Sequence, residues 1–153
     1  MVLIQKAIGV LKKRLSRALN ETDTGIEQLS ANGDAFVKFL NEKAFYASLI
    51  IKFEKKILFD EESGENVLLV EPILDILQKI LIKGSKDKTL RSDIATKELV
   101  TILWSQMLGI LNTLSGKQEI LNIYGVNRDW IIKGHYRVIM SGLAANAQVD
   151  DKL

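Results

Sequence analysis

The sequence has no cysteine, one proline and one histidine among its 153 residues. Without cysteine the chain can form neither a disulfide nor a thiolate metal site, which fits a reducing cytoplasm. A single histidine, His135, cannot supply the two or three imidazoles of a common zinc or iron centre within one chain. The sequence therefore predicts no metal and no cofactor.

Long apolar runs and an excess of one charge are also missing. No stretch of about 18 apolar residues is present, so nothing is expected to span a membrane. The first residues, MVLIQKAIGVLKKRL, carry charges from Lys6 onward and lack a signal-peptide cleavage site. With 21 basic and 19 acidic residues, bulk charge gives no case for nucleic-acid binding. We expect a cytoplasmic protein without a membrane partner.

Catalytic motifs are absent as well. There is no Gly-rich phosphate loop, no nucleophile elbow and no Ser-His-Asp order. The acidic stretch 60–66 lacks the ligand alternation of an EF-hand loop and is interpreted as a solvated loop. His135 is expected at an interface or a polar rim. Carboxylates on the predicted helices are scattered rather than paired as acid and base: Glu42, Glu54, Asp75 and Glu98. The sequence predicts a protein that is not an enzyme.

What the sequence does contain is helical periodicity. Hydrophobic residues make up 47% and charged residues 26%, which indicates one domain with a real core. Apolar residues recur at spacings of three and four, which predicts an all-α bundle of about six to seven helices. We assign residues 1–143 to the domain and 144–153 to a flexible tail. The expected helices cover 2–19, 25–43, 44–59, 67 or 72 to 83, 92–115, 117–124, and 127 or 129 to 143.

Several helix boundaries have local signals. Thr24 and Glu27 fit a capping box, and Pro72 suits a first helical turn. Gly125 is expected to end the short sixth helix, and Asn127 or Asp129 to start the last one. The tripeptide at 31–33, Ala-Asn-Gly, is a candidate interruption of the second helix because glycine destabilises a helix interior by about 1 kcal/mol.

The first helix is expected to be amphipathic, with its basic residues on one side. That basic face is either simply solvated or lies near an anionic partner such as DNA or a membrane.

The stretch from Ser92 to Ser115 is the most apolar of the predicted helices. Ser92 is a predicted N-cap, and Asp93 lies where the helix dipole favours a carboxylate. Its apolar residues exceed a single stripe, so the helix must be covered on two sides, by its own core and by a second subunit. The chain also has more soft and aromatic bulk than a small core needs, which indicates either plain packing or a site for an apolar guest.

The segments Ser92-Asp93, Leu99-Val100, 102–104 and 107–110 together resemble the penultimate helix of TetR-family transcriptional regulators, with an aliphatic-Trp pair followed by a glycine. The end of the last helix, 138–143, is similar to the family's final helix, and the helix order agrees over 2–143. The resemblance implies a TetR C-terminal-domain-like fold whose last two helices form a four-helix bundle in a homodimer.

The resemblance also assigns residues. The implied pocket for a small, mainly apolar ligand has six candidates: Phe36, Tyr46, Phe53, Leu77, Trp104 and Met107. The implied dimer interface has five: Leu103, Ile110, Ile131, His135 and Val138. In the family, the ligand controls DNA binding by an N-terminal helix-turn-helix head. No such head precedes Val2, so we expect either a fragment of a longer regulator or a headless relative, which contacts DNA only through a head absent here.

Two further functions fit the same pattern. The chain could be a helical interaction module that buries its final helices against a different protein. It could also be a carrier of hydrophobic ligands. A symmetric homodimer would favour the regulator, because a shared patch is self-complementary about a two-fold axis.

Overall fold

The computed structural model describes residues 2–59, 69–114 and 118–147. Within these residues the chain is all-helical, which confirms the predicted fold class, with one isolated bridge between Leu90 and Ala144. The helices are α1 Val2–Arg17, α2 Gly25–Glu42, α3 Ala44–Phe59, α5 Glu71–Lys86, α6 Thr96–Leu114, α7 Gln118–Ile123 and α8 Arg128–Leu143, followed by a 3-10 turn, η1 Ala145–Ala147.

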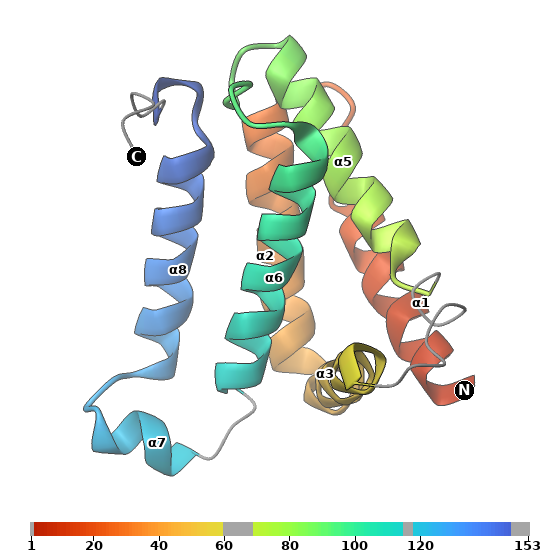
Figure 1. The fold of residues 1–153 in the computed structure, drawn as a ribbon, viewed down its shortest axis with the longest axis vertical. Coiled ribbons are helices and arrows are strands. Elements are labelled where there is room, and N and C mark those ends of the chain that lie inside the picture. The colour runs from red at the N-terminus through yellow and green to blue at the C-terminus, as the bar shows by residue number, and fades with distance from the viewer. Residues whose placement is uncertain (1, 60–68, 115–117, 148–153) are drawn as a thin grey trace.

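The bundle is built around α2, which contacts α1, α3, α5 and α8 (Figure 1). Helix α3 lies across one end, where it contacts α1, α2 and α6, and α5 contacts α1, α2 and α6. The helix after Ser92, the most apolar one predicted, contacts α3 and α5, whereas α2 contacts four helices. The largest fully buried apolar side chains come from α1, α2, α3, α5 and the α5–α6 loop: Leu11, Leu15, Phe39, Ile50, Ile73, Leu77, Ile80 and Leu90.

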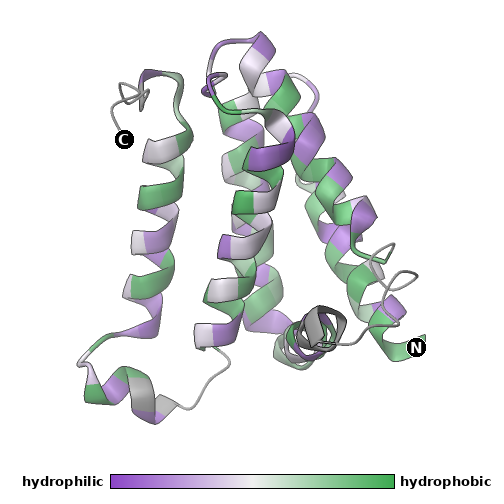
Figure 2. Ribbon diagram, viewed as in Figure 1, coloured by the Kyte–Doolittle hydropathy of each residue, from purple (hydrophilic) through white to green (hydrophobic). Residues whose placement is uncertain are grey.

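Helix α1 shows why the apolar spacing produces this packing. Ile4, Ile8, Leu11 and Leu15 repeat every three or four residues and are buried on one face. Figure 2 shows hydrophobic and hydrophilic residues interspersed along the helices. On the other side of α1 the lysines are exposed, while Arg14 is part of a surface ion pair with a carboxylate of α2.

The start of α2 is held by hydrogen bonds from two directions. Glu27 Oε2 accepts from the Thr24 amide at 2.8 Å and Thr24 Oγ1 accepts from the Glu27 amide at 3.4 Å, which confirms the capping box. Asp87 of the α5–α6 loop accepts from the Gly25 amide at 2.7 Å. At this crossing α2 and α5 meet backbone to backbone, since a Cβ on Gly25 would lie 2.1 Å from the Gly84 Cα.

The start of α6 differs from the prediction. The helix begins at Thr96, so the predicted N-cap at Ser92 is wrong. The reason is tertiary: Arg91 donates from Nη2 to Asp93 Oδ2 at 2.6 Å, and its amide donates to the Leu143 carbonyl at 2.8 Å. The second of these bonds ties Arg91 to the end of α8.

The other boundaries follow the local signals closely. Pro72 lies in the first turn of α5, as predicted, and α5 continues to Lys86 rather than ending at residue 83. Gly125 has a φ of +63°, a left-handed conformation that glycine adopts readily after a helix end. Asn127 is the N-cap of α8, and its Oδ1 accepts from the Asp129 amide at 2.8 Å.

The first part of the predicted tail is ordered against the bundle. The Ala145 amide donates to the Thr89 carbonyl at 3.2 Å, next to the Leu90–Ala144 bridge. Residues 148–153 lie outside the described residues, as does the predicted acidic loop 60–66. None of the described helices combines the length and the apolar character that a membrane crossing requires.

Candidate functional site

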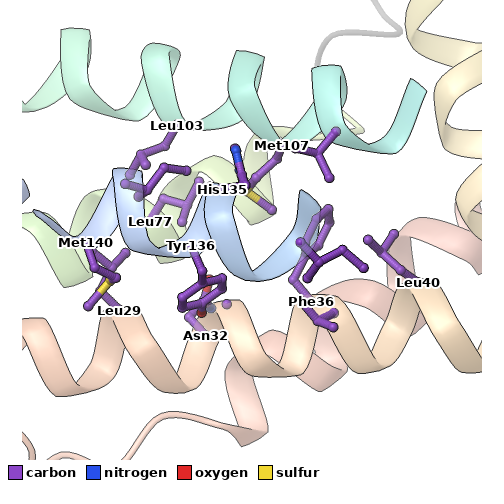
Figure 3. Close-up of a pocket in the computed structure, with 15 residues that line it drawn as sticks. Leu29, Asn32, Phe36, Leu40, Leu77, Leu103, Met107, His135, Tyr136 and Met140 are labelled. Atoms are coloured by element: carbon purple, nitrogen blue, oxygen red, sulfur yellow. The ribbon is translucent and has the colours of Figure 1, made fainter. Parts of the chain in front are cut away.

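A cavity lies between α2, α6 and α8, with Leu77 of α5 at its floor (Figure 3). Almost all of its wall is apolar. The lining residues are Leu29, Asn32, Gly33, Phe36, Val37 and Leu40 of α2, Leu77 of α5, Leu103, Met107 and Ile110 of α6, and Ile132, His135, Tyr136, Ile139 and Met140 of α8. We name it the α2–α6–α8 cavity.

The internal volume of the cavity is about 60 Å³. One water molecule needs about 10–15 Å³ measured in this way, and an apolar site of this kind is expected to stay dry. Pockets for drug-sized ligands are several times larger, about 300 Å³ or more. The cavity therefore suits a small molecule of a few heavy atoms, or a larger one if α8 moves outward.

One end of the cavity is closed by the contact of Tyr136 with Gly33. The Tyr136 ring lies so close to α2 that a Cβ on Gly33 would be 1.4 Å from the hydroxyl oxygen. That hydroxyl donates to the Ser30 carbonyl at 2.8 Å. The predicted interruption of the second helix at 31–33 is not present, because α2 is continuous here and the glycine serves to admit a ring from α8.

Next to this contact lies the most unusual polar group of the cavity. Asn32 is 2% exposed, and its Nδ2 has no hydrogen-bond partner among the described residues. Figure 3 shows Asn32 on α2 close to Tyr136 of α8. Buried polar groups in native proteins are nearly always paired, so an unpaired amide in a cavity wall requires a reason.

His135 is the second polar group and points from α8 toward α6 (Figure 3). Burial lowers the pKa of His135, because an apolar environment disfavours the charged imidazolium. Burial also raises the pKa of Tyr136 well above its ordinary value. No Lys, Arg, Asp or Glu is among the lining residues, so at neutral pH the described wall presents no charge.

Helix α8 covers the cavity while being only lightly buried itself. Only Ile132 and Leu143 of this helix are classed as buried. Its start is held by Arg128, which donates to Asn41 Oδ1 at 2.8 Å, and its end by Arg91, which donates to the Gly142 carbonyl at 2.9 Å. Helix α8 is thus held at its two ends and at Tyr136.

The structure brings three of the six predicted ligand residues to the cavity: Phe36, Leu77 and Met107. The other three lie elsewhere. Trp104 is buried in the core, whereas Tyr46 and Phe53 of α3 are half-buried against the core and do not line the cavity.

The predicted dimer residues separate into two groups. Leu103, Ile110 and His135 face inward and line the cavity. Ile131 is half-buried, and Val138 is 71% exposed on the outer face of α8. Of the five, Val138 is therefore the one whose side chain is openly available to a second subunit.

Other large apolar side chains of α6, α8 and the end of α7 are also exposed. Trp130 is 78% exposed and lies two turns before Val138 on the same side of α8, since residues at multiples of four share a helix face. Ile102 of α6 is 44% exposed, and Ile123 and Tyr124 at the end of α7 are also open to solvent.

Sequence reasoning missed the residues that give the cavity its polar character. The sequence analysis treats Asn32 and Gly33 only as a candidate interruption of the second helix and does not single out Tyr136. A signal was available: asparagine is a poor residue for a helix interior and rarely buried, so its presence in an apolar helix face points to a special role.

Comparison with known proteins found no match, either among protein-family models, among curated proteins or among solved structures. The similarity to TetR-family regulators thus depends on the sequence segments described above. The function has to be argued from the cavity and from the exposed face of α8.

Proposed function

We propose that this chain is the effector-binding and dimerisation domain of a TetR-like transcriptional regulator. In this proposal a small, mainly apolar molecule binds in the α2–α6–α8 cavity, and two chains associate through their last two long helices. Ligand binding is coupled to DNA by a head outside residues 1–153. The observation that carries the proposal is an apolar cavity lined by a helix, α8, that is anchored at its ends and carries two exposed apolar side chains, Trp130 and Val138.

The cavity and the outer face are two sides of one helix. His135 and Tyr136 of α8 line the cavity, whereas Trp130 and Val138 point to solvent. A ligand that displaces α8 would therefore also displace any surface that α8 presents to a partner. This coupling needs no additional moving element and is the physical basis of the proposed regulation.

Ligand binding is tested by nuclear magnetic resonance titration with toluene, a neutral apolar probe. We expect saturable shifts at Met107, Ile132 and their neighbours. The variant Ile110→Phe, which fills the cavity, should weaken binding at least tenfold, whereas Leu108→Phe on the same helix but outside the cavity should not. Absence of saturable shifts in the unmodified chain would refute the ligand-binding part of the proposal.

Dimerisation is tested by native mass spectrometry. A homodimer has twice the 17.2 kDa mass of the chain. Val138→Glu places a charge in the proposed interface and should yield monomers, whereas Gln5→Glu on exposed α1 should leave the dimer intact. A monomeric unmodified chain at micromolar concentration would contradict the regulator proposal.

Coupling can be measured because the chain has no cysteine. A single spin label at Gln5→Cys, on an exposed site of α1, reports the distance between the two first helices of a dimer. We expect this distance to change when toluene saturates the cavity. An unchanged distance at full occupancy would show that the ligand does not control the separation of the two first helices.

A second candidate function, a module that binds a different protein, is favoured by one observation. Ile123 and Tyr124, at and just after the end of α7, are exposed apolar side chains in addition to Trp130 and Val138 of α8. A chain that stays monomeric, with Trp130 protected only when a partner protein is added, would support this function. A monomer that retains a bound hydrophobic molecule through purification would instead support a carrier.

A further inference from the structure

The polar end of the cavity indicates which chemical class of ligand it would bind. Asn32 is nearly fully buried in the middle of α2, and its Nδ2 donates to no group among the described residues. The nearby Tyr136 hydroxyl donates to the Ser30 carbonyl and does not accept a hydrogen bond from Asn32 Nδ2. A hydrophobic residue at this position would bury no unpaired donor, so the packing of the surrounding side chains does not explain the amide.

The rest of the wall limits what can pair with Asn32. The lining contains no charged side chain, and burial of His135 favours its neutral form. An ion placed here would lose its hydration without gaining a counter-charge, which is strongly unfavourable. The site therefore favours a neutral molecule.

We propose that the ligand of the α2–α6–α8 cavity is a neutral apolar molecule with a carbonyl oxygen that accepts a hydrogen bond from Asn32 Nδ2. This inference rests on the proposed ligand-binding function. A carbonyl group fits because it accepts hydrogen bonds and brings no donor that would need its own partner. The apolar body of the molecule would lie against Phe36, Met107 and Met140, of which the two methionines can adjust to its shape.

The test compares two molecules of nearly the same shape, cyclohexanone and methylenecyclohexane. In the ketone an oxygen replaces the exocyclic CH₂ group, so a difference in affinity reports on the hydrogen bond. We expect the unmodified chain to bind cyclohexanone about tenfold more tightly, a preference typical of one neutral hydrogen bond to an otherwise unpaired donor. The Asn32 side-chain amide resonance should move downfield with cyclohexanone and not with methylenecyclohexane.

The variant Asn32→Leu provides the matched control. It should lose the preference for the ketone while binding methylenecyclohexane at least as tightly as the unmodified chain. Equal affinities for the two probes in the unmodified chain, or a preference that survives in Asn32→Leu, would overturn the inference and leave the ligand-binding proposal intact. If neither probe binds, the ligand-binding proposal fails as well.

Neutrality is tested separately with cyclohexanecarboxylate. We expect it to bind more weakly than cyclohexanone at pH 7. Tighter binding of the carboxylate would overturn the assignment of a neutral ligand.

The downfield shift of the Asn32 amide is measured in the unmodified chain, so it does not depend on how well the Asn32→Leu variant folds.

Discussion

The contact between Gly33 and Tyr136 yields the sharpest prediction about this fold. Replacing a glycine by alanine in a helix interior normally stabilises a protein by about 1 kcal/mol. At Gly33 the new Cβ would lie 1.4 Å from the Tyr136 hydroxyl oxygen and 2.1 Å from Cζ. Ordinary contacts begin near 3.4 Å, so the ring would have to move by about 2 Å. Gly33→Ala should therefore be destabilising.

The magnitude follows from what the displaced ring loses. Forced overpacking costs about 1–3 kcal/mol, and loss of the hydrogen bond from Tyr136 to the Ser30 carbonyl costs about 0.5–1.5 kcal/mol. After the helix-propensity gain, we expect a net loss of about 2 kcal/mol in the free energy of unfolding. For a domain of this size that lowers Tm by about 4–8 °C.

The assay is urea denaturation at fixed protein concentration, followed by circular dichroism. Gly9→Ala on α1, where a Cβ meets nothing within 4 Å, is the matched control and should be about 1 kcal/mol more stable than the unmodified chain. In a Tyr136→Ala background the effect of Gly33→Ala should reverse sign, because the obstacle is gone. If Gly33→Ala stabilises the unmodified chain as much as Gly9→Ala does, α8 does not pack on α2 as described.

Three further predictions concern single groups. Thr24→Ala removes one half of the capping box of α2 and should cost about 1 kcal/mol in urea denaturation; an unchanged midpoint would contradict the cap. Because burial lowers the folded-state pKa of His135 below its ordinary value of 6.5, the unfolded chain binds more protons, so stability should fall as pH drops from 7 toward 5. In His135→Gln that loss should be smaller, and equal pH profiles would refute the assignment. Burial instead raises the folded-state pKa of Glu54 above its ordinary value of 4.5, so the folded chain binds more protons and stability should fall as pH rises from 4.5 through the raised pKa. The advantage in stability of Glu54→Gln over the unmodified chain should therefore grow from pH 4 to pH 7. A constant difference would argue against this assignment.

The sequence by itself determined the secondary structure to within a few residues. The spacing of Ile4, Ile8 and Leu11 is sufficient to define α1, because a 3.6-residue period places them on one face wherever the helix packs. The capping box at Thr24 and the N-cap at Asn127 were predictable for the same reason, since both depend on atoms no more than three residues apart. Local chemistry was enough for these features.

The tertiary structure alone decided the start of α6 and the character of the cavity. Ser92 is a good local cap, but Arg91 is bound to Asp93 and to the end of α8, about 50 residues away in the chain. In the same way, the sequence predicts a helix interruption at Asn32 and Gly33, and only the position of the Tyr136 ring explains these residues within a continuous helix. Which apolar residues face a cavity, a core or solvent depends on how the helices are rotated against one another, and periodicity within one helix does not contain that information.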